Sequence, residues 1–403
     1  MAKALIFLAD GMADLPLEKL GGKTPLEAVD TPAMDSIAAK GSSGTFLTLP
    51  DGLPTSSDVA NMSVLGLRPE LNYPGRGPIE AVSQDVEIAK NDIVWRCNLV
   101  TISPEGDMAD YSAGHIDDKV SRQLIADLQA KFGNGKVTFY PGVSYRNLVV
   151  LHGSEFSDKV AYYKPDSSHG INIEDLHWTA RDNSEEAEHT VDFLNDLFAE
   201  TADFLAKHSL NAGKESPASH IWPWSPGKRP NLKSFSECFP GKTGAIISAV
   251  DVIRGIGKCI GMDVIDVPGA TGYIDTNYAG KAAAAIEAVK THDFVYLHVE
   301  AIDECSHEGN LELKMQAIAD FDSKIVAPVL EALKDEAVIF AVLPDHPVPI
   351  ELRKHTRTPV PLAICGPGIE CDDVKVFSES EALQGRLGFL KGDELMKILL
   401  ELK

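Results

Sequence analysis

Aspartate and histidine residues recur in three short segments toward the C-terminal end of this 403-residue chain. The segments are Asp303-x-x-x-His307, the adjacent pair Asp345-His346, and His355 a few residues further on. Carboxylate and imidazole groups together suit borderline divalent metals such as Mn²⁺ or Zn²⁺, whereas Mg²⁺ prefers a shell of oxygen ligands. Each segment also has an ordinary alternative, since the pair could lie in a turn and the i, i+4 residues could share a solvated helix face.

A hydroxyl group that could accept a phosphoryl group lies near the N-terminus, in the segment 54–66. Ser57 lies at the start of a helix predicted from about Val59, where free backbone N–H groups and the positive end of the helix dipole favour an anion. A serine at such a position can form a phosphoserine if a metal or a base lowers the pKa of its hydroxyl. The alternative is that Ser56, Ser57 or Asp58 is simply the N-cap of that helix.

The carboxylates follow segments that the sequence predicts to be buried strands. Each comes directly after an apolar run or a few positions beyond it: Asp10 after 4–9, Asp303 after 294–299, and Asp345 after 337–343. Continuous apolar runs are typical of strands that are buried on both faces of a parallel sheet. Because ligands of open parallel sheets bind outside the carboxyl ends of the strands, we expect these side chains to converge.

We expect the converging side chains to form two metal sites. The first would consist of Asp303, His307 and His355, and the second of Asp10, Asp345 and His346 beside the Ser57 oxygen. Two divalent ions about 4 Å apart can polarise a phosphoryl group, lower the pKa of a serine and stabilise both oxygens of an in-line displacement. Several such features at the strand ends of one sheet favour this interpretation over the separate alternatives.

The elements that must position these residues alternate between strands and helices. This alternation predicts an α/β fold with a doubly wound parallel sheet and helices on both faces. Segments rich in proline and glycine at 72–78 and 211–230 indicate domain boundaries. We therefore expect a core domain from residues 1–77 and 231–403, with a smaller α/β domain inserted at 78–230.

Composition excludes several classes of partner. The formal charge of −23, with no basic stripe to offset it, argues against binding to nucleic acid or to anionic membranes. No apolar run reaches membrane-spanning length, and the N-terminus is charged too early for a signal peptide. The six cysteines show no paired spacing and are interpreted as reduced thiols, which predicts a cytoplasmic protein. The oligomeric state stays open.

The motifs resemble those of the alkaline phosphatase superfamily. They are Asp10-Gly-Met, Thr24-Pro-Leu-Glu-Ala, Ser57-Asp-Val-Ala-Asn, Asp303-x-x-x-His307, Asp345-His346 and His355-Thr-x-x-Pro-Val-Pro. Over essentially its whole length the chain is more closely similar to the archaeal-type cofactor-independent phosphoglycerate mutases. The resemblance implies glycolytic interconversion of 2-phosphoglycerate and 3-phosphoglycerate through a phosphoserine on Ser57. It also implies an alkaline phosphatase-like core with two divalent ions. Mn²⁺ is the first candidate for these ions, and Zn²⁺, Co²⁺ or Mg²⁺ are alternatives.

The same resemblance implies that the inserted domain binds the small phosphorylated substrate and re-orients it between two half-transfers. It assigns phosphate or carboxylate contacts to His115, Arg146 and Lys242. From the residues alone, an ordinary surface side chain is the favoured interpretation for each of the three.

Some segments depart toward a bacterial subgroup proposed to be homoserine kinases. These segments are 222–228, 269–277 and 300–307. The alternative function is therefore a homoserine kinase of threonine biosynthesis with the same metal core, because both reactions transfer a phosphoryl group through an activated oxygen. A third hypothesis is a non-catalytic metal-binding module, which the joint presence of Ser57 and every expected ligand disfavours.

Overall fold

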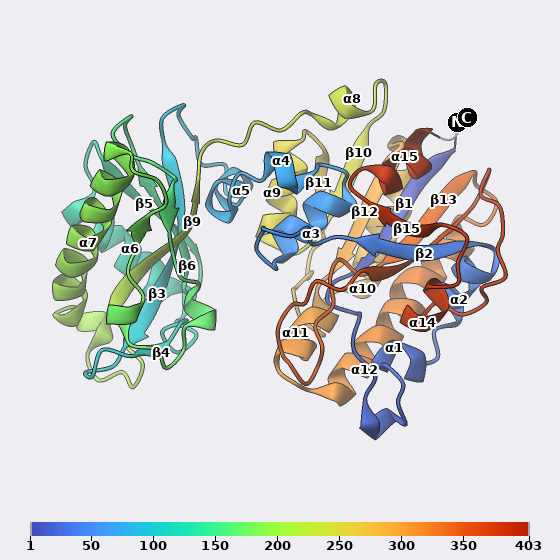
Figure 1. The fold of residues 1–403 in the computed structure, drawn as a ribbon, viewed down its shortest axis with the longest axis horizontal. Coiled ribbons are helices and arrows are strands. Elements are labelled where there is room, and N and C mark those ends of the chain that lie inside the picture. Colours follow the sequence, from blue (N-terminus) through green and yellow to red (C-terminus); the bar gives the residue numbers. More distant parts are fainter. Residues whose placement is uncertain (1, 402–403) are drawn as a thin grey trace. The chain divides into compact units, whose positions relative to one another are not determined.

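The computed structural model describes residues 2–401 and divides the chain into two compact units. The core unit consists of the N-terminal segment through Tyr73 and the chain from Leu232 onward, and the middle unit is Pro74–Asn231 (Figure 1). Within residues 2–401, every helix is too short or too polar to cross a lipid bilayer.

The core unit is built on an eight-stranded sheet with the order β11-β10-β12-β1-β13-β14-β2-β15. Its strands are β1 (Lys3–Ala9), β2 (Gly41–Leu47), β10 (Gly244–Ile247), β11 (Asp263–Ile265), β12 (Phe294–Val299), β13 (Val338–Leu343), β14 (Val360–Cys365) and β15 (Gly388–Lys391). Strand β1 pairs in parallel with β12 on one side and with β13 on the other. The prediction of a mixed α/β fold with a largely parallel sheet is confirmed.

One strand departs from the predicted parallel arrangement. Strand β14 runs antiparallel to both of its neighbours, β13 and β2. The segment 344–359, which joins β13 to β14, contains no helix. A parallel connection needs a crossover, usually a helix, so a strand that returns without one pairs antiparallel. As a result β14 begins at the end of the sheet where β13 ends.

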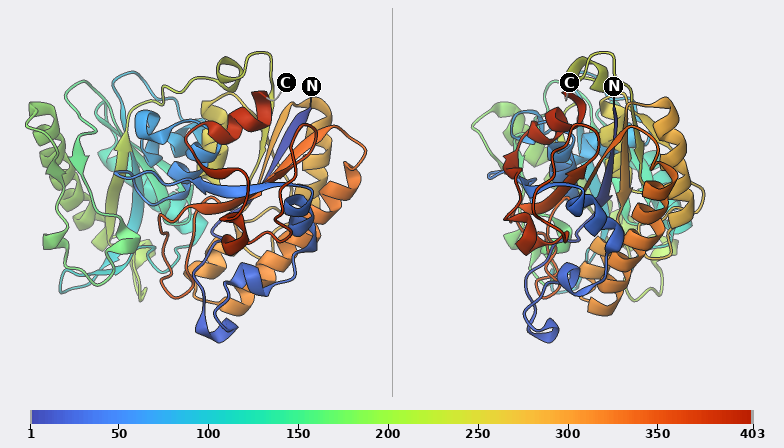
Figure 2. Two further views of the ribbon diagram at one scale, coloured as in Figure 1. Left: turned by 45° about the vertical axis from the view of Figure 1, so that its right-hand side comes forward. Right: turned by 90° about the vertical axis from the view of Figure 1, so that its right-hand side faces the viewer.

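Helices cover both faces of this sheet (Figures 1 and 2). On one face, Leu5, Phe7 and Ala9 of β1 share a buried core with residues of α2, α10, α12 and α13. The other face carries α9 against β10 and β11, and α15 against β1. The helices are α1 (Pro25–Ala28), α2 (Pro32–Ala39), α3 (Ser57–Val64), α4 (Pro69–Asn72), α8 (Phe235–Cys238), α9 (Asp251–Cys259), α10 (Tyr278–Thr291), α11 (Ala301–His307), α12 (Leu311–Phe321), α13 (Ala327–Ala332), α14 (Glu379–Ala382) and α15 (Glu394–Glu401).

Helices α12 and α13 occupy a stretch where the apolar periodicity alone favours one long helix. A π-helical turn, Asp322–Val326, separates them. Pro328 follows this turn and has no backbone N–H to continue the helical hydrogen bonds, which accounts for the local change of register.

The middle unit contains an antiparallel sheet in which β3 pairs with both β6 and β9 and β6 pairs with β5. Its elements are α5 (Arg76–Ser83), β3 (Ile93–Ile102), β4 (Met108–Asp110), α6 (Asp118–Phe132), β5 (Val137–Val143), β6 (Arg146–Leu151), β7 (Val160–Ala161), β8 (Thr179–Ala180), α7 (Glu185–Ala206) and β9 (His220–Gly227). The side chains of α6 and α7 pack with one face of β3, β5 and β6 in a buried core.

The interpretation of 211–230 as a boundary is wrong for much of its length. Strand β9 (His220–Gly227) lies within it, and both Trp222 and Trp224 are buried. Prolines mislead here because they cannot donate a ladder hydrogen bond and so argue against a central strand. Strand β9 pairs with β3 alone, so its prolines are accommodated at the sheet edge.

We expect the stability of the core unit to depend on pH because of one carboxylate, that of Glu379 in α14. Glu379 accepts hydrogen bonds from the Thr24 hydroxyl, at 2.8 Å, and from the backbone N–H of Asp14, at 3.1 Å. Burial raises the pKa of Glu379 from its ordinary 4.5 to about 7. The folded protein therefore holds this proton to a higher pH than the unfolded chain, so the contribution of Glu379 to stability falls as pH rises from about 4.5 to about 7.

Glu379→Gln is expected to flatten this part of the stability profile. Urea unfolding at about pH 5 and about pH 8 should show a smaller loss of unfolding free energy in the variant than in the wild type. Glu381→Gln, an exposed position on the same helix, is the matched control and should keep the wild-type slope. Equal slopes for all three proteins would contradict the assignment.

Candidate active site

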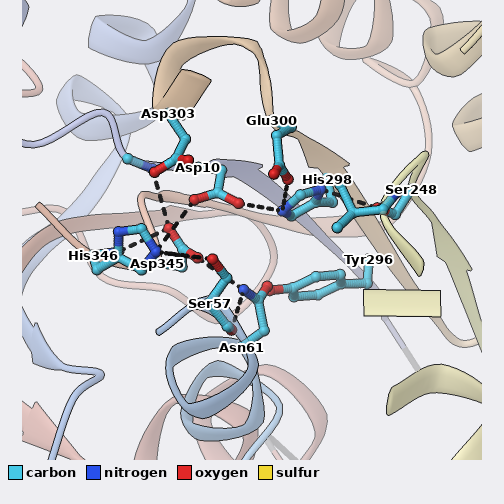
Figure 3. A network of polar contacts seen from close by, with 12 residues as sticks. Asp10, Ser57, Asn61, Ser248, Tyr296, His298, Glu300, Asp303, Asp345 and His346 are labelled. Atoms are coloured by element: carbon cyan, nitrogen blue, oxygen red, sulfur yellow. Dashed lines mark hydrogen bonds and ion pairs between the residues drawn. The ribbon is translucent and has the colours of Figure 1, made fainter. Parts of the chain in front are cut away.

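The site residues are positioned by the carboxyl ends of three neighbouring strands (Figure 3). Asp10 directly follows β1, and Asp345 follows β13 by one residue. Helix α11 begins just after β12 and places Asp303 and His307 one helical turn apart. Because β12, β1 and β13 are adjacent and parallel, residues distant in the sequence meet at one end of the sheet, beyond the carboxyl ends of these strands.

One cluster brings together the second predicted ligand set and Ser57. The Nε2 atom of His346 lies 3.4 Å from Asp10 Oδ1, 3.3 Å from Asp345 Oδ2 and 3.2 Å from Ser57 Oγ. Asp10, Asp345 and His346 are each 0% exposed. The cluster is therefore shielded from bulk solvent, and its carboxylate oxygens face the imidazole nitrogen of His346.

The first predicted ligand set forms an adjoining cluster. His307 Nε2 lies 2.9 Å from His355 Nε2 and 3.4 Å from Asp303 Oδ2, and His355 Nε2 lies 3.5 Å from Asp303 Oδ1. The ring of His355 stacks on that of His346 at 3.8 Å between centroids, so the clusters are contiguous. The antiparallel direction of β14 explains how His355, just before that strand, reaches this edge.

Both clusters fit divalent cations. Asp10 Oδ1, Asp303 Oδ1 and Glu300 Oε2 are buried and have no hydrogen-bond partner among the described residues. A buried carboxylate oxygen without a partner is unfavourable, and a cation would satisfy it. Three carboxylates and three imidazoles in two adjoining groups are also the donor chemistry that borderline divalent metals prefer.

Electrostatics distinguishes the carboxylates of the site. Burial, followed by the charge of Asp345, raises the pKa of Asp10 well above its usual range. Burial also raises the pKa of Glu300 to about 8. Burial opposes ionisation of Asp303 too, but its hydrogen bond with His307 prevails and holds its pKa below the usual range. Carboxylates so close together stay ionised only when a positive charge balances them, and otherwise take up a proton.

Ser57 occupies the first turn of α3, whose N-cap position is Ser56. No side-chain hydrogen bond caps this helix, and the Ser57 hydroxyl instead contacts His346. Asp58, the third cap candidate, accepts a 2.5 Å hydrogen bond from the Tyr73 hydroxyl. The N-cap alternative is therefore not what the hydroxyl of Ser57 does in this structure.

Four further polar residues belong to the site and carried no role in the sequence analysis: Asn61, Tyr296, His298 and Glu300. Asn61, one turn after Ser57, donates to Asp345 Oδ2 at 2.8 Å. Tyr296 donates to Asn61 Oδ1, and His298 contacts Asp10. The available signal was the spacing of Tyr296 and His298 in the otherwise apolar β12, with Glu300 directly after the strand, because residues two positions apart share one face of a strand.

Lys242 does not join the cluster. It precedes β10, and its charge acts on Asp293, which precedes β12. Both positions lie at the amino ends of these parallel strands, whereas the cluster lies at the carboxyl ends. Lys242 is therefore at the opposite end of these strands from the cluster, contrary to its prediction as a phosphate or carboxylate contact.

His115 and Arg146 lie together within the middle unit. The His115 ring is 6.2 Å from the Tyr145 ring, and the Arg146 guanidinium carbon is 5.5 Å from the centroid of the same ring. His115 has a positive φ of 49°, a left-handed backbone conformation that is uncommon for residues other than glycine.

Comparison with known proteins places this geometry in a family. The model of the metalloenzyme superfamily matches residues 2–402. The chain is 46% identical, with 100% of both chains covered, to the 2,3-bisphosphoglycerate-independent phosphoglycerate mutase of Methanosarcina barkeri.

Two solved structures share the fold over the whole chain. The PH0037 protein from Pyrococcus horikoshii has a TM-score of 0.83 and 27% identity, covering 100% of this chain and 97% of the other. A cofactor-independent phosphoglycerate mutase from Thermoplasma acidophilum has a TM-score of 0.66 and 27% identity, with 100% of both chains covered. The resemblance inferred from the motifs is thereby confirmed. The chain belongs to the metalloenzyme superfamily and, within it, to the family of 2,3-bisphosphoglycerate-independent phosphoglycerate mutases.

Proposed function

We propose that this protein interconverts 2-phosphoglycerate and 3-phosphoglycerate through a phosphoserine on Ser57. The observation that carries the proposal is the Ser57 hydroxyl, which lies 3.2 Å from His346 Nε2 beside two contiguous Asp/His clusters. The names of the full-length relatives support the substrate class.

The residues of the clusters would hold two divalent ions, with Mn²⁺ as the first candidate. One ion would be bound by Asp303, His307 and His355. The other would be bound by Asp10, Asp345 and His346 beside Ser57. When bound, such ions supply Lewis-acid polarisation of the phosphoryl oxygens and lower the pKa of a serine hydroxyl.

The transfer would proceed in two half-reactions, each of which forms one bond to phosphorus and breaks another. In the first, Ser57 Oγ bonds to phosphorus, the bond from phosphorus to the glycerate oxygen breaks, and that oxygen gains the serine proton. In the second, the other glycerate hydroxyl attacks the phosphoserine, and Ser57 regains a proton as its bond to phosphorus breaks. The first turn of α3 adds backbone N–H groups and a helix dipole, which favour the anionic phosphoryl group.

We further propose that the middle unit is the domain that binds the glycerate. Support comes from a local cluster of arginines within it, where Arg76, Arg96 and Arg146 surround a single carboxylate. Glu80 accepts from Arg96 at 2.6 Å and from Arg76 at 2.7 Å, so one carboxylate faces two guanidinium groups. Burial opposes ionisation of Glu80, but the charges of Arg96, Arg76 and Arg146 lower its pKa. In a chain of net charge −23, such a cluster suits an anionic substrate.

Two assays on the same preparation test the function. With 3-phosphoglycerate and Mn²⁺, an enolase-coupled assay should show mutase turnover without 2,3-bisphosphoglycerate and without ATP. The matched assay supplies ATP and homoserine and detects phosphohomoserine by mass spectrometry. Product only in the second assay would replace the mutase with the kinase, and product in neither would favour a non-catalytic metal-binding module.

A further inference from the structure

We propose that His298, held by Ser248, is a positioning residue that leaves only one carboxylate oxygen of Asp10 available to a metal. The inference rests on the proposed role of Asp10 as a metal ligand, and it adds a hydrogen-bonded support behind that ligand. Figure 3 shows the chain of contacts from Ser248 through His298 to Asp10.

The placement of His298 follows from strand register. His298 lies on β12 opposite Leu8 of β1, and the backbone N–H of Asp10 donates to Val299 O at 3.0 Å. The His298 side chain is 0% exposed. Its Nε2 lies 3.0 Å from Asp10 Oδ2, and its Nδ1 lies 3.1 Å from Ser248 Oγ. Both imidazole nitrogens are thus engaged, and the ring cannot turn without breaking two hydrogen bonds.

The partners determine which nitrogen carries the proton. A metal-binding Asp10 is an ionised carboxylate, which can only accept, so His298 Nε2 must carry a proton and donate it. Ser248 Oγ accepts the backbone N–H of Val250 at 3.0 Å. Its own O–H can then donate to His298 Nδ1, which fixes the Nε2–H tautomer of the neutral ring.

This arrangement divides the two oxygens of Asp10 between two tasks. Oδ2 is held by His298, while Oδ1 has no hydrogen-bond partner within residues 2–401 and lies 3.4 Å from His346 Nε2, within the proposed metal cluster. Asp10 is therefore oriented to bind an ion through Oδ1 alone. Without His298 the carboxylate could rotate, and its second oxygen would compete for the ion or remain buried and unpaired.

A third ion that His298 itself ligates is the competing interpretation. Asp10, His298 and Glu300 each offer one ligand atom, and these atoms lie within 4.8 Å of one another. The buried ammonium of Lys281 argues against it. Lys281 Nζ donates to the backbone oxygen of His298 at 3.2 Å and its charge acts on Glu300. An added divalent ion beside this ammonium would be repelled.

The experiment counts bound ions rather than activity. Metal-free protein is titrated with Mn²⁺ alone, and the number and affinity of sites are measured by calorimetry and by electron paramagnetic resonance. The wild type should bind two ions. His298→Leu should weaken one site roughly 10- to 100-fold and leave the other unchanged, as loss of a hydrogen-bond partner of a metal ligand typically does. His298→Gln, which restores an N–H donor, should recover part of the affinity.

Controls separate positioning from general damage. His292→Leu makes the same chemical change before β12, at the other end of that strand, and should keep both affinities. Ser248→Ala removes one hydroxyl and should weaken the same site by a smaller factor, even if His298→Leu does not fold.

Two results would overturn this inference alone. The first is unchanged affinity at both sites in His298→Leu and Ser248→Ala. The second is three ions in the wild type, one of them lost in His298→Leu. Because no substrate is present, absence of mutase turnover would refute the proposed function without touching this result, whereas a wild type that binds no Mn²⁺ would overturn both.

Discussion

Ser57→Ala is expected to eliminate the phosphoenzyme and to lower turnover by roughly three orders of magnitude or more, because the covalent intermediate cannot form. The hydroxyl lies beside His346 and makes no capping hydrogen bond, so its removal should leave the helix largely intact. An ordinary N-cap would behave differently, since its loss lowers stability by about 1 kcal/mol and spares most activity.

Ser56→Ala is the matched control for this prediction. Ser56 is the neighbouring serine, and its buried Oγ has no hydrogen-bond partner among the described residues. The variant should therefore retain both activity and phosphoenzyme. Acid quenching during turnover, followed by peptide mass spectrometry, locates the phosphate. Phosphate on Ser56, or turnover that persists in Ser57→Ala, would show that the nucleophile is another group.

Removal of metal is expected to abolish phosphoryl transfer, and Mn²⁺ is expected to restore it, with Co²⁺ or Zn²⁺ as partial substitutes. The physical reason is the charge of the site. Asp10, Asp303 and Asp345 are all buried within two contiguous clusters, and bound divalent ions would balance their negative charge. Chelation should also lower the unfolding temperature, since ions that bind only the folded state stabilise it.

Substitution of a single ligand refines the metal prediction. Asp303→Ala should weaken the site shared with His307 and His355, and calorimetry should show the other site still filled. Glu312→Ala, at the start of the next helix, offers a comparison outside both clusters. Full turnover by metal-stripped protein in excess chelator would refute the two-metal hypothesis.

The positions of the proposed ligands were largely predictable, because these residues follow strands whose apolar content marks them clearly. Strand β12 was predicted with the bounds it has, and β1 and β13 within a residue. Parallel neighbours place their carboxyl ends at one edge, so the chemistry of Asp10 and Asp345 indicated their proximity in space. Local pattern sufficed where burial on both faces left a continuous apolar signal.

What the sequence did not reveal depends on pairing between distant segments. The direction of β14 is set by its partners, and nothing in its six residues distinguishes parallel from antiparallel pairing. Strand β9 is stabilised at an edge where its prolines do no harm, a fact that only its pairing with β3 makes visible. Lys242 was assigned a role in substrate binding by resemblance alone, and the strand directions place it at the amino ends of the strands, away from the cluster.

The antiparallel return of β14 has a consequence for how the active site can change during evolution. The connection 344–359 begins and ends at one sheet edge, with Asp345 and His346 near its start and His355 toward its end. Its early part is tethered, because Lys314 Nζ donates to Val348 O at 2.9 Å. Residues 351–354, between that tether and His355, are exposed. Lengthening a closed surface loop costs little free energy, about 0.6 kcal/mol per doubling. The chain length between the two groups of proposed ligands can therefore change by insertion at this turn, while both groups stay at the same end of the sheet.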